Sequence, residues 1–279
     1  MPLFVNSVVL NPEYAGPLER TLGFALILLT LDYFIAWGPL KHVIIKLFKS
    51  PDPAESPAGK KLCGQVAARI VGSFFLFMMF PRALKVLFDQ KLASDPVYAS
   101  SNESYNCMIL AAGYFLYDVI LCITRFNENG IAFSIHAVVC CFAFCTAIVT
   151  GQLHHIGAGF LLWEASTPFL YFRWVLLKAG LAESKYLMPL ANYSFIFAFF
   201  CCRVVYGPLL SKEFFVATQK ELVNPRTGGM SAATIYAYYV AMIMMNSLNY
   251  YWFLNMMRLA IFGGKKVHAA EKVEHNHED

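Results

Sequence analysis

Seven long apolar segments constrain what this chain can fold into. They cover approximately residues 19–40, 62–84, 105–123, 131–151, 156–177, 188–210 and 234–261, and short polar connections separate them. Each is long enough to cross a bilayer as a helix, which takes about 17–25 mostly apolar residues. Lipid cannot satisfy backbone polar groups, so a spanning segment forms its hydrogen bonds internally, as an α-helix does. The sequence therefore predicts an all-α polytopic membrane protein with about seven transmembrane helices.

The composition agrees with this class. Apolar residues make up 58% of the chain and charged residues 14%, against about 45–50% and about 25% in soluble domains. The net charge of +4 is small and scattered, so we expect no nucleic-acid partner. Six of the eight cysteines fall within apolar runs, where a reduced thiol behaves as a small hydrophobe. We expect neither disulfides nor a bound metal, and no cofactor.

The segments divide the chain into three parts. Residues 1–60 hold the first transmembrane helix and a lysine-rich loop, residues 61–262 hold the other six helices, and residues 263–279 form a polar tail that we expect to be disordered. On an odd-even count of the loops, twelve lysines and arginines lie on one side and seven on the other. The positive-inside rule then predicts an outside N-terminus and a cytosolic C-terminus. The sequon Asn102-Glu103-Ser104 falls in a loop on the outer side.

Ionisable residues inside the spans each need an explanation, because one at the bilayer centre costs at least roughly 2.5–3.5 kcal/mol. They can pair between helices and hold the bundle together, or they can serve function. They are Asp32, Arg69, Asp118, His136, Glu164, Arg173 and Arg203.

Depth along straight helices sorts these residues into two layers. At about 1.5 Å per residue, Arg69, Asp118, His136 and Arg173 lie roughly 6–10 Å from the cytosolic ends of their spans. Glu164 and Arg203 lie roughly 10–12 Å from the outer face and are expected to form a structural polar pair. In the last span, Asn246 and Asn249 lie near one helical face. We expect them to hydrogen-bond a neighbouring helix, with Asn249 also a candidate for substrate binding.

His136 is the only histidine well inside a span, and it is the candidate catalytic residue. A neutral imidazole can accept a proton from an amine or hydroxyl, or attack an acyl group itself. Asp118 shares its predicted layer and is the candidate to orient it. The alternative is a packed histidine with a purely structural role. Arg69 and Arg173 are candidate contacts for a phosphate or carboxylate near the cytosolic mouth.

Several strings resemble a known family, in the right order from about Lys61 to Ile261. Residues 113–118 (GYFLYD), 133–136 (FSIH), 164–169 (EASTPF) with Arg173-Trp174, 200–204, and 248–253 (LNYYWF) are similar to segments of the TLC (TRAM-LAG-CLN homology) domain. The resemblance implies a six-helix membrane barrel around a lipid tunnel, with one extra leading helix here. It also implies membrane lipids as partners, and the endoplasmic reticulum or another endomembrane as the location.

The best-known enzymes of that family are ceramide synthases, which join a fatty acyl-CoA to a sphingoid amine. Their paired histidines appear here as Ile135-His136, and their later His-Asp…Asp stretch appears as Trp163-Glu164…Thr167. The chain therefore resembles the TLC domain-containing subgroup more than the ceramide synthases. Two functions follow from the resemblance. One is acyl transfer from acyl-CoA to an amine or hydroxyl lipid through His136, and the other is non-enzymatic lipid binding that regulates membrane composition or trafficking. A channel or transporter fits less well, because the chain has no internal repeat.

Overall fold

The computed structural model describes the backbone of residues 12–275 and the side chains of residues 16–261, and this part of the chain contains helices and no strands. The helices are α2 (Pro12–Trp37), α3 (Leu40–Leu47), α4 (Pro57–Phe88), α5 (Gln90–Ser94), α6 (Asn102–Thr124), α7 (Phe126–Thr150), α8 (His154–Leu161), η1 (Leu162–Ser166), α9 (Thr167–Lys178), α10 (Leu187–Phe199), η2 (Phe200–Val205), α11 (Tyr206–Val223) and α12 (Ala232–His275). The all-α prediction is confirmed.

Five stretches of the described chain are long and apolar enough to cross a membrane. They are Gly16–Trp37, Pro57–Phe88, Asn102–Thr124, Phe126–Thr150 and Leu187–Val223. The other two predicted spans correspond to the run from α8 to α9 and to α12, which are helical but fall outside this group. The chain is a polytopic membrane protein, and the count of seven spans stays a prediction.

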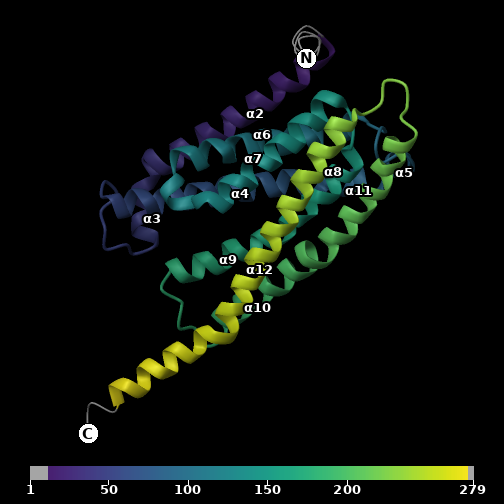
Figure 1. Cartoon of the computed structure of the whole chain (residues 1–279). Coiled ribbons are helices and arrows are strands. Elements are labelled where there is room, and N and C mark those ends of the chain that lie inside the picture. Colours follow the sequence, from purple (N-terminus) through teal and green to yellow (C-terminus); the bar gives the residue numbers. More distant parts are fainter. Residues whose placement is uncertain (1–11, 276–279) are drawn as a thin grey trace.

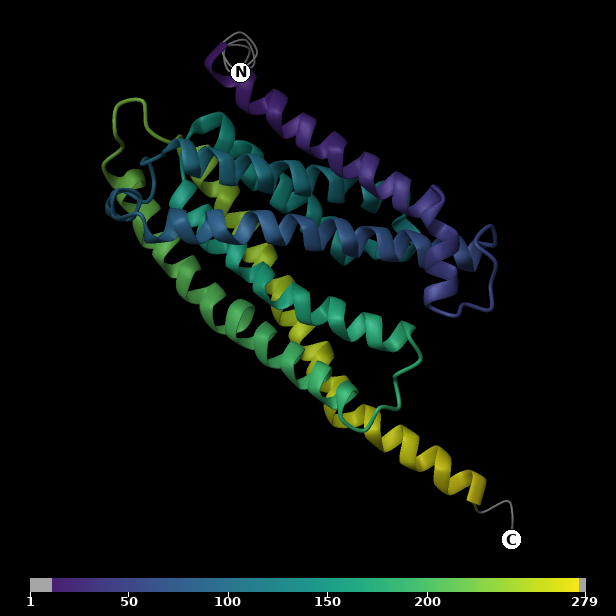
Figure 2. The same ribbon diagram turned by 180° about the vertical axis from the view of Figure 1, so that it is seen from behind.

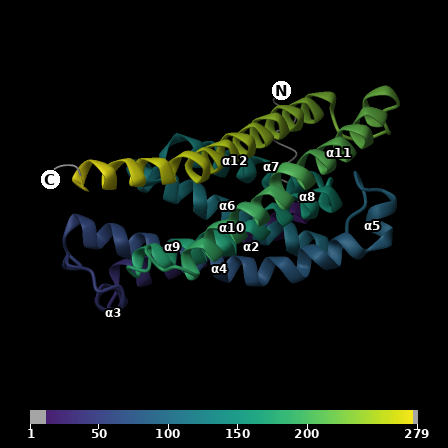
Figure 3. The ribbon, with the colours of Figure 1, turned by 90° about the horizontal axis from the view of Figure 1, so that it is seen from below.

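Six helical units close into a ring. Four of the units are the single helices α4, α6, α7 and α12, and the other two are the runs α10–η2–α11 and α8–η1–α9. Around the ring, α4 packs on α6, α6 on α7, and α7 on α12. Helix α12 packs on η2 and α11, α10 packs on α9, and α8 and η1 pack on α4, which closes the ring. Figure 3 shows α12 and α4 on opposite sides of the bundle. Helix α2 stands outside the ring and packs against α4 and α6 (Figure 2). The arrangement agrees with an all-α bundle, whereas the barrel of six membrane-spanning helices that the resemblance implies stays a prediction.

The two ends of the bundle can be told apart by their connections (Figure 1). At one end of the bundle α6 connects to α7 through Arg125, and we call this the Arg125 end. The opposite end carries α5, the start of α8 and the connection from α11 to α12, and we call it the Asp95 end. Helix α12 runs on past the Arg125 end as far as His275. The disordered tail predicted from residue 263 stays a prediction, and its last four residues, 276–279, lie outside the described part of the chain.

A buried ion pair fastens α2 to the ring. The guanidinium of Arg125 pairs with the carboxylate of Asp32, and it also donates to the carbonyl of Gly64 at 3.0 Å. The Tyr117 hydroxyl donates to the same carboxylate at 3.1 Å. Asp32 is only 4% exposed, and an unpaired charge at such a position would be strongly destabilising. The pair therefore explains how α2 carries an acid within a membrane span.

At the Asp95 end, two networks join the connections. His154 is fully buried, its Nδ1 lies 2.8 Å from the Ser104 hydroxyl, and its Nε2 lies 3.1 Å from the Ala147 carbonyl, so it ties α8 to α6 and α7. In the second network, Arg226 Nη1 lies 2.6 Å from Asp95 Oδ2. The Arg226 guanidinium, by donating this hydrogen bond, holds the pKa of Asp95 below its ordinary value.

Candidate functional site

Two irregular turns face each other inside the ring. Pro168, in the first turn of α9, has no N–H and crowds the carbonyl four residues earlier, so α8 gives way to the 3-10 turn η1, which carries Glu164. On the opposite helix, the π turn η2 carries Arg203. Single π turns inside α-helices are frequent at functional sites.

Arg203 is the centre of a buried polar cluster between these turns. Its Nη2 lies 2.8 Å from Glu164 Oε1, its Nε donates to the Ser166 hydroxyl at 3.1 Å, and its Nη1 donates to Asn249 Oδ1 at 3.3 Å. The Thr167 hydroxyl donates to the second oxygen of Glu164 at 2.6 Å. The sequence placed Glu164 and Arg203 at one depth, and the structure pairs them directly. Asn249 was expected to hydrogen-bond a neighbouring helix, and it does so by accepting the hydrogen bond from Arg203.

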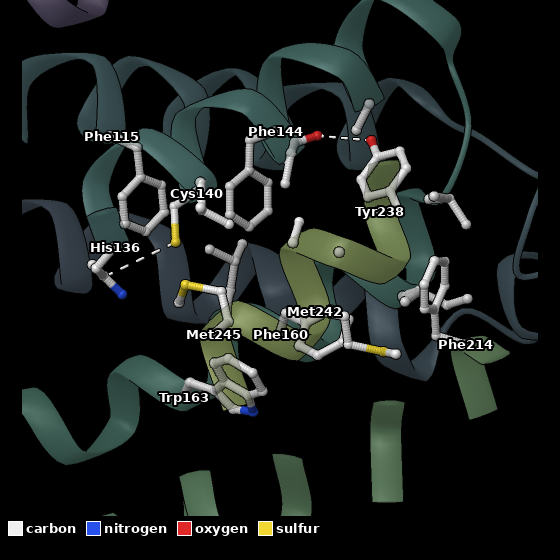
Figure 4. A pocket seen from close by; sticks show the side chains of 18 of the residues that line it. Phe115, His136, Cys140, Phe144, Phe160, Trp163, Phe214, Tyr238, Met242 and Met245 are labelled. Atoms are coloured by element: carbon white, nitrogen blue, oxygen red, sulfur yellow. Dashed lines mark hydrogen bonds between the residues drawn. The ribbon is translucent and has the colours of Figure 1, made fainter. Parts of the chain in front are cut away.

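His136 lies beside this cluster at one end of an apolar cavity. The cavity measures about 90 Å³ and runs between α7, α8, η1, α11 and α12. Its wall is almost wholly apolar, and Figure 4 shows the larger residues along it: Phe115, His136, Cys140, Phe144, Phe160, Trp163, Phe214, Tyr238, Met242 and Met245. From His136 to Ala147 the wall follows α7 for eleven residues, which is roughly 16 Å. The cavity is therefore an elongated apolar chamber with a polar end at His136.

The electrostatic neighbours of His136 are Glu164 and Arg203. The sequence predicted Asp118 as its orienting partner, but no hydrogen bond joins the two side chains in the part of the chain that the structure describes. The charged neighbour of Asp118 is Glu164 instead. Helix α7 gives His136 a sulfur neighbour, because the Cys140 Sγ lies 4.0 Å from its Nε2.

The two predicted layers thus lie within electrostatic reach of each other. Asp118 and His136 were expected nearer the cytosol than Glu164 and Arg203, yet each of them interacts with Glu164. The depth estimate assumed a constant rise of 1.5 Å per residue. A 3-10 turn rises about 2.0 Å per residue, and Glu164 lies on one, while Arg203 lies on a π turn. Straight-helix arithmetic therefore does not hold for these two residues.

Arg69 lies between α4 and α9 and has no carboxylate within salt-bridge distance among the described residues. Its guanidinium lies 3.8 Å from the centre of the Trp174 ring and 5.9 Å from that of Tyr171. One Nη donates to the Gln65 carbonyl at 2.8 Å, while its buried Nε has no partner in the described chain. Arg173, also predicted to contact substrate, donates its Nε to Asn192 Oδ1 at 2.7 Å. Of these two arginines, Arg69 is the one with a buried donor that has no partner among the described residues.

Tyrosines link the Arg69 region to the cluster. The Tyr171 and Tyr114 hydroxyls interact electrostatically with each other, and both lie within electrostatic reach of Asp118 and Glu164. Gly72 allows Tyr171 to reach this position, because a Cβ there would collide with its hydroxyl. Arg69, the tyrosines and the cluster therefore form a polar seam that ends at His136, where the apolar cavity begins.

Several buried polar atoms around the seam and cavity have no hydrogen-bond partner among the described residues. They include His136 Nδ1, Trp163 Nε1 and Asn249 Nδ2. Such groups cost about 1–3 kcal/mol each, so their gathering at one place calls for an explanation such as a ligand. Sequence reasoning missed Trp163, Tyr171 and Cys140. For Cys140 a signal was available in the sequence, because it follows His136 by four residues and therefore lies on the same face of a helix.

Several known proteins resemble this chain over more than half of its length. A family model described as the TLC domain matches residues 65–258. Topoisomerase I damage affected protein 4 of Saccharomyces cerevisiae is 32% identical over 57% of this chain and 57% of its own length. An uncharacterised TLC domain-containing protein of Schizosaccharomyces pombe is 29% identical over 58% of this chain and 54% of its own length. TLC domain-containing protein 4-B of Danio rerio is 24% identical over 71% of both chains. The chain thus spans little more than half the length of the first two of these relatives.

Proposed function

Because the chain belongs to the TLC domain family, we propose that it acts on membrane lipids and transfers a fatty acyl group from acyl-CoA to a lipid amine or hydroxyl. The observation that carries this proposal is the position of His136. It stands where the polar seam meets the apolar cavity, and its Nδ1 has no partner in the described chain. An amphiphile with a reactive polar end and a long chain matches this arrangement: the chain fills the cavity, and the thioester lies at His136.

In this proposal His136 acts on the reacting atoms. A neutral imidazole accepts the proton of the amine or hydroxyl as it attacks the acyl carbon. Glu164 is held by Arg203 and Thr167, and its charge favours the imidazolium that forms. The free Nε of Arg69 contacts a phosphate of the donor. Asp118 acts through Glu164 in this arrangement and not by a direct bond to His136.

The proposal sets the Arg125 end on the cytosolic side of the endoplasmic reticulum or another endomembrane, in line with the lysine and arginine count. Acyl-CoA then enters from the cytosol, meets Arg69 first, and extends its chain past His136 toward the Asp95 end. Glycosylation of Asn102, at the Asp95 end, would be compatible with this orientation.

The test is acyl transfer by the purified full chain. The protein is incubated with labelled acyl-CoA and either a sphingoid base or lysolipids, and the product is measured for the wild type, His136→Ala and His42→Ala. His42 is an exposed histidine outside the bundle interior and is the matched control. We expect His136→Ala to lower transfer by about 100-fold or more, as loss of a general base does. Equal transfer by the wild type and His136→Ala, or none by either, would refute the proposal.

Non-enzymatic lipid binding is the second candidate, and one observation favours it. Within the described residues no carboxylate hydrogen-bonds His136, so the histidine lacks the orienting bond of many catalytic imidazoles. Ala241→Trp, which fills the cavity, is compared with Val240→Trp, whose side chain is exposed on the same helix. If binding is the function, Ala241→Trp abolishes lipid co-purification and His136→Ala leaves it intact. If catalysis is the function, Ala241→Trp and His136→Ala both lose acyl transfer.

A further inference from the structure

The cavity wall carries a second nucleophile, one helical turn from His136. Cys140 is 9% exposed, and its Sγ lies 4.0 Å from His136 Nε2. Residues four apart in a helix lie on one face, and both of these residues line the cavity. Figure 4 shows the Cys140 sulfur directed into the space between His136 and Met245. A thiol and an imidazole therefore face the same chamber at its polar end.

The other reactive groups on the cavity wall are already engaged. The Tyr238 hydroxyl donates to the Ala143 carbonyl at 2.9 Å. Glu164 accepts from Arg203 and Thr167. Among the described lining residues, the groups able to attack an acyl carbon without first losing such a partner are the His136 imidazole and the Cys140 thiol.

We propose that Cys140 carries the acyl group during transfer and that His136 is its base, an inference that rests on the acyl transfer proposed above. His136 Nε2 takes the proton of the Cys140 thiol as Sγ attacks the thioester carbon. A new carbon–sulfur bond forms, the bond from the acyl carbon to the CoA sulfur breaks, and the proton passes from His136 to the departing CoA thiolate. The products are a Cys140 thioester and free CoA.

The second half of the cycle restores the thiol. The amine or hydroxyl of the acceptor lipid attacks the Cys140 thioester and gives its proton to His136. The bond to Sγ breaks, and His136 returns the proton to the sulfur, so no oxidant or reductant is needed.

The cavity suits this step for two reasons. Thiol–thioester exchange replaces one thioester by another, and a neighbouring base supplies the thiolate that attacks. The apolar chamber between Phe144 and Met242 holds the acyl chain beside its attachment point and keeps water from the thioester. An acyl group on Sγ also leaves the imidazole free to act as base in both halves of the cycle.

The test separates covalent loading from transfer. The purified full chain is incubated with alkyne-tagged palmitoyl-CoA without acceptor, and the adduct is located by peptide mass spectrometry. Hydroxylamine sensitivity identifies a thioester. The variants are Cys140→Ala, Cys140→Ser and His136→Ala, and the matched control is Cys141→Ala. Cys141 is the next residue of α7 and does not line the cavity. Size-exclusion profiles check folding, and Cys140→Ser keeps the side-chain shape if the alanine variant fails to fold.

We expect a hydroxylamine-sensitive adduct on Cys140 in the wild type and in Cys141→Ala. Cys140→Ala and Cys140→Ser should lose both this adduct and acyl transfer by about 100-fold or more. Reversible blocking of thiols with methyl methanethiosulfonate should abolish wild-type transfer, and dithiothreitol should restore it. Transfer that persists in Cys140→Ala but not in His136→Ala would overturn the role of Cys140 and leave acyl transfer standing. A wild type that neither forms an adduct nor transfers would refute both.

Discussion

The pair of Arg203 and Glu164 allows a quantitative test of the buried cluster. The two side chains are 6% and 12% exposed and their charged atoms lie 2.8 Å apart, inside a ring whose surroundings are lipid and apolar side chains. Removing one partner of such a pair leaves an uncompensated buried charge, which costs about 3–5 kcal/mol. Arg203→Met keeps the volume of the side chain and leaves Glu164 with only its bond from Thr167. Glu164→Gln leaves the guanidinium with Ser166 and Asn249.

The double variant separates pairing from the other contacts. Once both charges are gone, neither is left unpaired, so we expect the double variant to be no less stable than the worse single variant. The coupling energy in the double-mutant cycle should then be about 3 kcal/mol, at the upper end for neighbouring residues. In a chain of this size about 1 kcal/mol changes the melting temperature by about 2–4 °C. Each single variant should therefore lower it by roughly 6–20 °C.

The assay is unfolding of the purified full chain in mixed micelles, by titration with SDS and by heating, followed by tryptophan fluorescence. Lys212→Met, an exposed change on α11, controls for the loss of a positive charge and should stay within about 0.5 kcal/mol of the wild type. Single variants within about 1 kcal/mol of the wild type would refute the reasoning, and so would a double variant equal to the sum of the singles. Either result would mean that the cluster is hydrated or that its charges are neutralised.

Three further predictions concern the contacts that hold the bundle together. Because the pKa of Asp95 is depressed by Arg226, its carboxylate stabilises the fold fully above its ordinary pKa of 3.8 and loses this effect as the pH falls through the depressed value. Asp95→Asn should thus lower the free energy of unfolding by up to about 1 kcal/mol at neutral pH, a small effect because the pair is partly exposed. In a pH series of melting curves, the difference from the wild type should vanish at the acid end. Asp32→Asn should lower the free energy of unfolding by about 3–5 kcal/mol and weaken the packing of α2 on the ring. The measurement is the rate of cleavage at a protease site engineered before α3, which should rise. Unchanged cleavage would contradict the role of this pair in fastening α2. Ser104→Ala should cost about 1–3 kcal/mol by leaving its buried histidine partner unpaired, whereas a melting temperature equal to that of the wild type would show that another group takes its place.

Apolar length was sufficient to predict the helices, because a membrane span needs a long apolar stretch, and each predicted segment is helical over nearly all of its length. The same sequence did not predict which charges pair. Asp32 and Arg125 are 93 residues apart, and nothing local to either residue indicates its partner. Depth along ideal helices placed Glu164 and Arg203 at one level, as their ion pair requires. It placed His136 and Asp118 at another level, although both interact electrostatically with Glu164.

The positions of two other residues were not evident from the sequence, for physical reasons. His154 precedes the fifth predicted span, where a polar turn at the membrane surface is the ordinary expectation, yet it is buried among α6, α7 and α8. Cys140 lies in a run of apolar residues, where a cysteine is usually a small packing residue. Its distance of one turn from His136 became informative only when the cavity showed that both face the same space.

The π turn at 200–205 also has a consequence for how this chain can change in length. A π turn holds one residue more than the α-helical turn it replaces, so deleting a single residue there would restore an unbroken α-helix from α10 to α11. The local backbone would tolerate that deletion well. The extra residue is absorbed within that one turn, so the later side chains of α11 would keep their orientation, and Phe214 would still face the cavity. The residues inside the turn would move, and Arg203 is one of them. A single-residue deletion in this segment should therefore act through the displacement of Arg203 alone, whereas a deletion in the regular part of α11 would rotate every later side chain by about 100° about the helix axis.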